Sequence, residues 1–264
     1  MEDFSEVAIA AAREAGQLML DWRKDFPPGP ATMSYKGAKD VVTEVDTRAE
    51  EIIVSKIRAR FPDHQILAEE RGAMVGDSDY LWIIDPLDGT ANYAADLAAS
   101  CVSIALAYKA EVRLGVVYDP FRDELFVASK GEGVTLNGQP IGVSHETELS
   151  KALVCFDLGY NEAIAIKQLE EALFFRPRVR SMRILGSAVL GLCYVAVGRF
   201  DLFYHQSLHP WDLAAALLIV QEAGGITTTA TGEPAHYNNP SVVAANPIIH
   251  AAFFETKNVP GKHA

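Results

Sequence analysis

The segment Leu81-Trp-Ile-Ile-Asp85-Pro-Leu-Asp88-Gly-Thr90 joins a continuous apolar run to a turn that carries two carboxylates, a glycine and a hydroxyl. A short uninterrupted apolar run that ends at turn-forming residues predicts a strand covered on both faces. The ends of such strands are where open α/β sheets bind their ligands. Asp-Pro and Asp-Gly are also common in ordinary turns. The segment therefore predicts either a functional site or a plain turn at the end of a buried strand.

The sequence before this segment predicts two amphipathic helices and a short strand. Apolar residues recur at spacings of three and four over residues 4–24 and again over residues 49–57. Residues 36–46, between the two helices, are polar and predict a flexible connection. Residues 65–68 predict a strand that delivers Glu69 at its end.

The sequence after this segment changes character near residue 148. Before that point strands follow one another, which is typical of an antiparallel sheet, and after it strands and helices alternate. The predicted fold class is α/β, with residues 1–148 as an N-terminal α+β subdomain that carries most candidate ligands and residues 149–264 as a C-terminal α/β subdomain. The predicted elements are strands 101–108, 112–118, 124–128, 133–136, 152–157, 179–184, 202–204, 226–229 and 242–245, and helices 161–174, 187–197, 211–223 and one from Pro247.

Composition limits the classes of function. The chain has 264 residues, 49% of them hydrophobic, which is enough for one large core or two small ones. The formal net charge of −12 argues against a nucleic-acid surface, which needs clustered Lys and Arg. It allows an anionic small molecule if divalent cations bridge that molecule and an acidic site.

Hydropathy, the N-terminal sequence and the cysteine pattern predict the cellular location of the protein. No apolar run approaches the roughly 18 residues of a membrane span, and the acidic N-terminus lacks the features of a secretory signal. The three cysteines, Cys101, Cys155 and Cys193, have neither the spacing of a metal site nor an even number for disulfides. We therefore expect a cytoplasmic protein with no membrane and no nucleic-acid partner.

Carboxylates stand at the ends of predicted elements at Asp46, at Glu69 with Glu70, at Asp85 with Asp88, and at Asp212. Several of them also have a purely structural interpretation. Asp212 would complement the dipole of the helix that it begins, and Asp46 would cap the start of its helix. Glu69 and Glu70 would lie at a solvated strand end.

Four of these residues are candidate metal ligands: Glu69, Asp85, Asp88 and Asp212. If they converge, each pair of carboxylates about 4 Å apart repels by roughly 4 kcal/mol at an effective dielectric constant of about 20. Such a cluster needs cations. Because the donors are all oxygens, Mg²⁺ or Mn²⁺ is favoured over Zn²⁺. Two ions about 3.5 to 4 Å apart would clamp a phosphate, acidify a water and hold the leaving oxygen.

Gly89 and Thr90 would supply the rest of a phosphatase site. A glycine in the turn lets backbone N–H groups approach phosphate oxygens, and the Thr90 hydroxyl could orient the attacking water. Phosphatases with a nucleophilic aspartate space their two carboxylates two residues apart, whereas Asp85 and Asp88 are three apart. The spacing therefore favours attack by metal-activated water over a phosphoaspartate intermediate.

Five motifs occur together in this chain: Glu69-Glu70, Asp85-Pro-Leu-Asp88-Gly-Thr90-Ala-Asn92, Gly186-Ser-Ala188, Trp211-Asp212 and Glu222-Ala-Gly-Gly225. In combination they resemble the inositol monophosphatase family of Mg²⁺-dependent, lithium-sensitive sugar phosphatases. The similarity extends from the first predicted helix to the last. It implies a layered αβαβα sandwich, a homodimer, direct attack by water, and two or three Mg²⁺ ions for which Mn²⁺ could substitute.

The resemblance also implies a role for individual residues. The metal ligands would be Glu69, Asp85, Asp88, Asp212 and the backbone carbonyl of Leu87. Thr90 would activate the attacking water together with Glu69, and Asp46 and Thr43 would sit behind it.

For the substrate, the resemblance implies that the amides of Gly89 and Thr90 hold the phosphate. Asp88 and the Gly186-Ser187-Ala188 segment would contact the organic part. Lys36 would be the lysine of a mobile loop near a weaker metal site.

The predicted pocket departs from the family at two places. Many inositol-specific members have a glutamate seven residues before the metal-binding aspartate, where this chain has His205. An imidazole donates at least one hydrogen bond, titrates near neutrality and cannot reproduce the acceptors of a carboxylate. His205 either faces the organic part of the substrate or ends a strand that faces solvent. The loop at residues 94–100 also lacks the usual His and Pro of the family.

The sequence therefore predicts a Mg²⁺-dependent phosphomonoesterase of a small polyol or sugar phosphate, with inositol 1-phosphate as the default of the family. Histidinol phosphate, fructose 1,6-bisphosphate, 3′-phosphoadenosine 5′-phosphate and NADP are alternative substrates on the same fold. An alternative from another class is a regulatory or interaction protein that retains the fold. The intact acidic motifs argue against a purely non-catalytic role.

Overall fold

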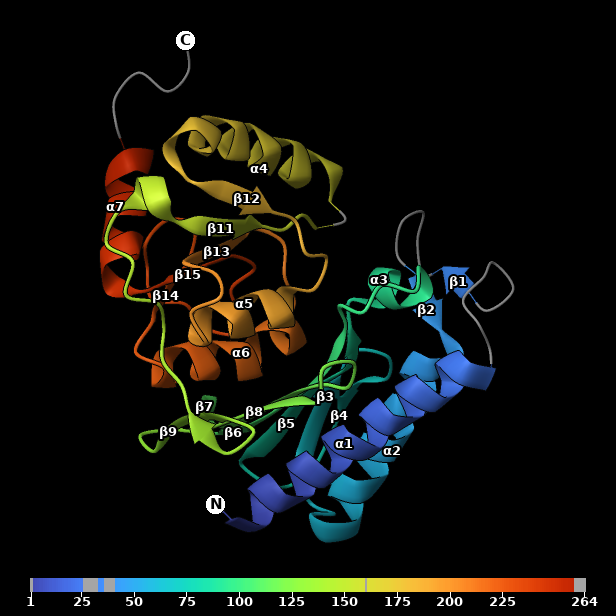
Figure 1. Ribbon diagram of the computed structural model, residues 1–264. Coiled ribbons are helices and arrows are strands. Elements are labelled where there is room, and N and C mark those ends of the chain that lie inside the picture. Colours follow the sequence, from blue (N-terminus) through green and yellow to red (C-terminus); the bar gives the residue numbers. More distant parts are fainter. Residues whose placement is uncertain (1, 26–32, 36–40, 160, 259–264) are drawn as a thin grey trace.

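The chain folds into five alternating layers of helices and sheets (Figure 1). The computed structural model describes residues 2–25, 33–35, 41–159 and 161–258. Helices α1 (Glu2–Asp25) and α2 (Glu44–Arg60) form one outer layer, and α4 (Glu162–Phe175) and α7 (Pro247–Lys257) form the other. Helices α5 (Ala188–Ala196) and α6 (Pro210–Glu222) lie between the two sheets. The predicted αβαβα sandwich is confirmed.

The first sheet has eight strands in the order β10-β9-β8-β7-β6-β5-β3-β4. All neighbouring pairs are antiparallel except β3 and β5, so the prediction of an antiparallel sheet holds for most of it. The strands are β3 (Gln65–Ala68), β4 (Gly72–Met74), β5 (Tyr80–Asp88), β6 (Cys101–Tyr108), β7 (Glu111–Asp119), β8 (Glu124–Ser129), β9 (Gly133–Leu136) and β10 (Gln139–Pro140).

Strand β5 is covered on both faces, as its continuous apolar run predicted. Trp82 and Ile84 pack in the core under α1 and α2, and Ile83 packs in the core that surrounds α5 and α6. All three side chains are at most 1% exposed. This burial on both faces explains why the strand shows no alternation of polar and apolar residues.

The turn predicted at Asp85 is wrong, because β5 continues through it to Asp88. On the neighbouring strand β6, Asp85 pairs with Ser103 and Asp88 pairs with Cys101, so β5 has one extra residue here. In a regular strand, side chains three positions apart point to opposite faces. The β-bulge removes this alternation and allows Asp85 and Asp88 to face the same side.

The second sheet has five strands in the order β12-β11-β13-β15-β14. Its first three strands are parallel, and β15 is antiparallel to both of its neighbours. The strands are β11 (Leu153–Phe156), β12 (Ser181–Arg183), β13 (Leu202–His205), β14 (Ile226–Thr228) and β15 (Val242–Ala245). The two sheets therefore divide the chain between residues 140 and 153, and the subdomain boundary at residue 148 stays a prediction.

The connection between α1 and α2 differs from the prediction. Strands β1 (Met33–Tyr35) and β2 (Val41–Thr43) pair antiparallel, and α2 begins at Glu44. Asp46 therefore lies inside the first turn of α2 and is not its cap. No helix among the described residues is long and apolar enough to cross a membrane.

Helix α6 lies directly on the first sheet. A Cβ atom added to Gly115 of β7 would lie 2.7 Å from the backbone oxygen of Ala215 in α6, so only glycine allows this approach. Residues 213–220 of α6 are buried because the helix has a sheet on each side. The packing at Gly115 thus sets the position of the helix that carries Asp212.

We expect Gly115→Ala to lower the free energy of unfolding by about 1 to 3 kcal/mol, because the added methyl group forces α6 away from β7. Urea unfolding measures the change. The matched control is Gly142→Ala, whose Cβ would lie 3.6 Å from the Ala223 backbone oxygen in ordinary contact. Equal stability of Gly115→Ala and wild type would contradict this account of the packing.

Candidate active site

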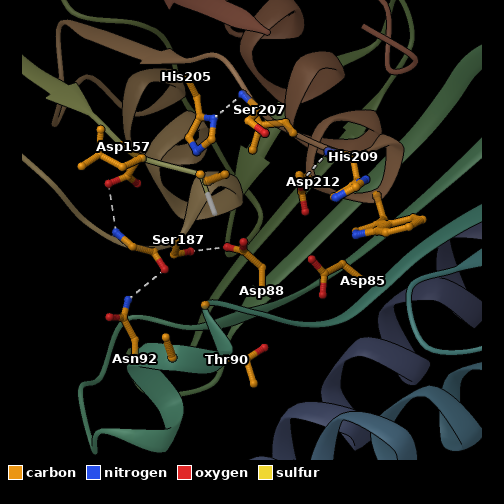
Figure 2. Close-up of a pocket in the computed structure, with 18 of the residues that line it drawn as sticks. Asp85, Asp88, Thr90, Asn92, Asp157, Ser187, His205, Ser207, His209 and Asp212 are labelled. Carbon is orange, nitrogen blue, oxygen red and sulfur yellow. Dashed lines mark hydrogen bonds between the residues drawn. The ribbon is translucent and has the colours of Figure 1, made fainter. Parts of the chain in front are cut away.

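A cavity of about 600 Å³ opens where the two sheets meet α3 (Thr90–Ala94) and the N-termini of α5 and α6. Figure 2 shows Asp85, Asp88 and Asp212 directed toward one another in this cavity. Each offers a carboxylate oxygen within 4.8 Å of the others. The structure therefore brings together three of the four predicted carboxylate ligands as one group.

Local structure fixes the direction of each carboxylate. Asp85 Oδ1 accepts a hydrogen bond from the Leu87 N–H across the bulge, at 3.0 Å. Asp212, in the first turn of α6, accepts one from the His209 N–H at 2.8 Å. The carboxylate of Asp212 therefore also holds the start of its own helix.

Asp88 is held from the other half of the molecule. Its Oδ2 atom accepts hydrogen bonds from the Ser187 hydroxyl and from the Val189 N–H, both at the start of α5. The Cys101 thiol lies 3.7 Å from the same oxygen. The predicted position of Ser187 on the cavity wall is found, but its hydroxyl binds Asp88.

The cluster is electrostatically unfavourable by itself. Burial raises the pKa of Asp85, and the neighbouring charges of Glu69, Asp88 and Asp212 raise it further. Burial also raises the pKa of Asp212, and burial raises that of Asp88 to about 6 despite the hydrogen bond from Ser187. Buried carboxylates that repel one another and offer only oxygen donors fit a hard divalent cation such as Mg²⁺.

Glu69 lies beside this group. It follows β3, its N–H donates to the Ile84 carbonyl at 3.2 Å, and it lines the cavity. A hydrogen bond between Glu69 and Asp85 is one of the interactions that raise the pKa of Asp85. Glu69 is not among the three residues whose ligand atoms lie within 4.8 Å of one another.

Glu50 positions the turn that carries Glu69. The Glu50 carboxylate is fully buried in α2, accepts a hydrogen bond from the Glu70 N–H at 2.8 Å and pairs with Arg71 at 3.4 Å. Sequence reasoning missed Glu50. The available signal was a charged residue between Ala49 and Ile53 on the buried face of a helix.

Thr90 lies next to the carboxylates at the start of α3. Its hydroxyl is within hydrogen-bonding distance of Asp46 Oδ1, at 3.1 Å, and of the Leu87 carbonyl, at 3.0 Å. Asp46 therefore sits behind Thr90, where the family resemblance placed it. Thr43 ends β2 just before α2, and its side chain lies outside the described part of the chain, as does Lys36 altogether.

Gly89 adopts a conformation that favours glycine, with φ at +84°. An added Cβ would also lie 2.7 Å from the Ala99 backbone oxygen. The first N–H groups of a helix lack acceptors within it, so those at the start of α3 are available to an anion. The glycine of the motif is thus required by the close approach of two backbone segments.

His205 ends β13, is 4% exposed and lies on the cavity wall, so the interpretation that it faces solvent is wrong. Its Nδ1 atom accepts a hydrogen bond from the Ser207 N–H at 3.0 Å. Burial lowers the pKa of His205 to about 4, although a backbone hydrogen bond with Leu158 opposes this. The expected titration near neutrality is therefore wrong, and the ring is neutral at pH 7.

Two residues to which the sequence analysis gave no role, Asn92 and Asp157, hold the Gly186 segment. Asn92 of α3 donates from Nδ2 to the carbonyls of Ala99, at 2.9 Å, and Leu185, at 2.8 Å. Asp157, just after β11, accepts from the N–H groups of Leu185 and Gly186 at 2.5 and 3.0 Å. Asn92 was part of a recognised motif, whereas Asp157 had no pattern around it.

Comparisons with known proteins agree with this geometry. A family model described as "Inositol monophosphatase family" matches residues 1–258. A tomato (Solanum lycopersicum) protein named inositol monophosphatase 1 is 38% identical, over 97% of this chain and 94% of that protein. The Nus factor SuhB of Escherichia coli K12 is 39% identical, over 94% of this chain and 93% of that protein. The solved structure of extragenic suppressor protein suhB from Bartonella henselae has a TM-score of 0.91 at 32% identity, covering 98% of this chain and 99% of that one.

The burial of His205 should make its contribution to the free energy of unfolding decrease in acid. Its folded-state pKa of about 4 lies below the ordinary 6.5, so the unfolded chain binds the extra proton between these values. The contribution of the neutral His205 to the free energy of unfolding is fully present above pH 6.5. This contribution falls as the pH decreases toward 4, by about 2 kcal/mol between pH 7 and 5. His205→Asn, which keeps an acceptor near Nδ1, should lose less stability over this interval in urea unfolding. His145→Asn, at an exposed histidine, should behave as wild type. A His205→Asn profile parallel to that of wild type would contradict the neutral, buried state.

Proposed function

The chain belongs to the inositol monophosphatase family of phosphatases, and from this premise we propose that it is a Mg²⁺-dependent phosphomonoesterase of a small polyol or sugar phosphate. The observation that carries the proposal is the group of Asp85 and Asp88, which are buried, and Asp212, which is partly exposed, in the cavity. A buried group of mutually repelling carboxylates is unfavourable for folding, and divalent cations offset that cost when they bind.

The residues that would hold the cations are Glu69, Asp85, Asp88, Asp212 and the Leu87 carbonyl. When bound, Mg²⁺ or Mn²⁺ would neutralise phosphate charge, lower the pKa of a water molecule and stabilise the leaving oxygen. Thr90 hydrogen-bonds to the Leu87 carbonyl, which has a second lone pair for a cation. The hydrogen bonds from Ser187 and Val189 keep the Asp88 carboxylate in place for the same purpose.

The chain's own groups would bind the phosphate and orient the nucleophile. The N–H groups of Gly89 and Thr90, at the start of α3, would donate to phosphate oxygens. The Thr90 hydroxyl gives its one proton to Asp46 or to the Leu87 carbonyl, which leaves its oxygen free to accept a hydrogen bond from a water molecule. Thr90 and Glu69 would then orient that water toward phosphorus.

The identity of the organic group is the finer part of the proposal. Inositol 1-phosphate remains the default substrate, and histidinol phosphate, fructose 1,6-bisphosphate, 3′-phosphoadenosine 5′-phosphate and NADP remain alternatives. The neutral ring of His205 gives the cavity wall no carboxylate at the position where many inositol-specific members have a glutamate. If an inositol phosphate is the substrate, another acceptor must bind its hydroxyls.

A regulatory role stays a second possibility from another class, and what supports it is the name of the E. coli relative, Nus factor SuhB. Such a role would not require three clustered carboxylates, two of them buried, that repel one another, so the cluster favours catalysis. A homodimer, sensitivity to lithium, a cytoplasmic location and the lack of a nucleic-acid partner stay predictions.

The test is phosphate release from the five candidate substrates with Mg²⁺, in wild type and in Asp85→Asn. Wild type should hydrolyse at least one substrate and lose activity in EDTA, and Asp85→Asn should be inactive. Without metal the variant should be no less stable, because removing one charge relieves repulsion. Mg²⁺ should raise the melting temperature of wild type more than that of Asp85→Asn. Full turnover by the variant, or by wild type in EDTA, would refute the metal-dependent mechanism.

Thr90→Ala should lower kcat and kcat/KM together, by about 10² to 10³-fold, because a hydroxyl that orients the attacking water acts mainly in the transition state. Thr90→Ser keeps the hydroxyl and should retain most of the activity. Steady-state kinetics on the best substrate, with Mg²⁺ affinity from melting shifts, distinguishes the possibilities. An effect of Thr90→Ala on KM alone would show that Thr90 only binds substrate.

A further inference from the structure

Asp157 places a second buried carboxylate on the wall of the cavity, away from the metal-ligand group. The residue follows β11, is 2% exposed and lines the cavity beside Gly159 and His205. Its Oδ1 atom accepts hydrogen bonds from the N–H groups of Leu185 and Gly186. Its Oδ2 atom has no hydrogen-bond partner among the described residues.

A buried acceptor without a donor is unfavourable, by about 1 to 3 kcal/mol and more for a charged group. Holding the Gly186 segment explains Oδ1, which accepts from the Leu185 and Gly186 N–H groups, and the Ser187 N–H adds a further backbone interaction with the carboxylate. It does not explain Oδ2, which has no hydrogen-bond partner among the described residues. An asparagine would serve that purpose with less charge to bury. The second oxygen therefore points to a donor that comes from outside the chain.

The position of Oδ2 indicates which part of a substrate it would meet. Figure 2 shows the Asp157 carboxylate on the same side of the cavity as His205 and on the opposite side from Asp85, and Gly186 donates its N–H to this carboxylate. The phosphate would lie at Thr90 and the carboxylate group, so the Asp157 wall faces the organic group that the phosphate esterifies. Hydroxyl groups are the donors that a polyol offers there.

His205 does not provide this acceptor. Its Nδ1 atom is occupied by the Ser207 N–H, and the ring also has a backbone hydrogen bond with Leu158. The ring thus fixes the Leu158-Gly159 backbone next to Asp157. The His205 ring therefore supports the cavity wall, and the acceptor without a partner on that wall is Asp157 Oδ2.

We propose that Asp157 determines substrate specificity, with its Oδ2 atom accepting a hydrogen bond from a hydroxyl group on the organic part of the substrate. This inference rests on the proposed phosphatase function and names the class of substrate more closely. A carboxylate at this wall attracts hydroxyl donors and repels a second phosphate. It thus favours a polyol monophosphate over fructose 1,6-bisphosphate, 3′-phosphoadenosine 5′-phosphate and NADP.

The experiment compares two substrates that share a six-membered ring, myo-inositol 1-phosphate and cyclohexyl phosphate, which lacks the ring hydroxyls. The variant is Asp157→Asn, whose amide oxygen can still accept from Leu185 and Gly186 while its NH₂ group replaces Oδ2. We expect kcat/KM for inositol 1-phosphate to fall by about 10 to 100-fold, as for a hydrogen-bonded pocket that loses its partner. For cyclohexyl phosphate, kcat/KM should stay within about twofold of wild type.

The matched control is Asp201→Asn. Asp201 is also a buried aspartate of the second half, 7% exposed, whose Oδ2 accepts from the Leu153 N–H at 2.6 Å, and it is not among the residues that line the cavity. This control should leave the ratio of the two substrates unchanged. An equal loss on both substrates in Asp157→Asn would mean that Asp157 only positions the Gly186 segment, and no loss on either would also overturn the proposal. If wild type hydrolyses neither these two compounds nor the wider panel, the proposed function itself fails, and the inference with it.

Discussion

Asp85 and Asp88 lie three residues apart on one strand and yet face the same side, and the rest of the site depends on this arrangement. One extra residue in β5 relative to β6 makes it possible. The Asp85 side chain spans the irregularity by accepting the Leu87 N–H. Once both carboxylates face the cavity, the chain holds a repulsive pair in a buried place, and the surrounding elements must keep it there.

That support comes from both halves of the molecule. The start of α5 holds Asp88 through Ser187 and Val189. Helix α6 carries Asp212, and the absence of a side chain at Gly115 lets α6 lie close to β7. Asn92 links α3 to the segment before α5. The cavity is therefore complete only when the two sheets have closed on α5 and α6, so the folding of each half and the assembly of the site are coupled. Burial and mutual repulsion raise the pKa values of the three aspartates, so this arrangement disfavours their charged forms.

Much of the fold could be predicted because its elements have clear periods. The amphipathic helix at the N-terminus and the continuous apolar run of β5 both carry their burial pattern in the sequence. The bulge could not be predicted, because a gain of one residue depends on the register against β6, and register is a property of the pair of strands. Of the site, the aspartates and Thr90 were predictable from their motifs. Glu50 and Asp157 were not, since their roles arise from contacts with backbone segments about 20 to 30 residues away. The chemical state of His205 was misjudged because burial, which lowers its pKa, is not visible in the chain around it.

We propose that Asp85, Asp88 and Asp212 form a site for divalent cations. The most direct measurement is anomalous scattering from crystals of the protein grown with Mn²⁺, which substitutes for Mg²⁺ at oxygen sites. We expect at least one strong anomalous peak among the carboxylate oxygens of these three residues, at about 2.0 to 2.3 Å from them, with the fold unchanged. Well-ordered crystals at saturating Mn²⁺ with no peak at this position, or with peaks only elsewhere on the surface, would contradict it.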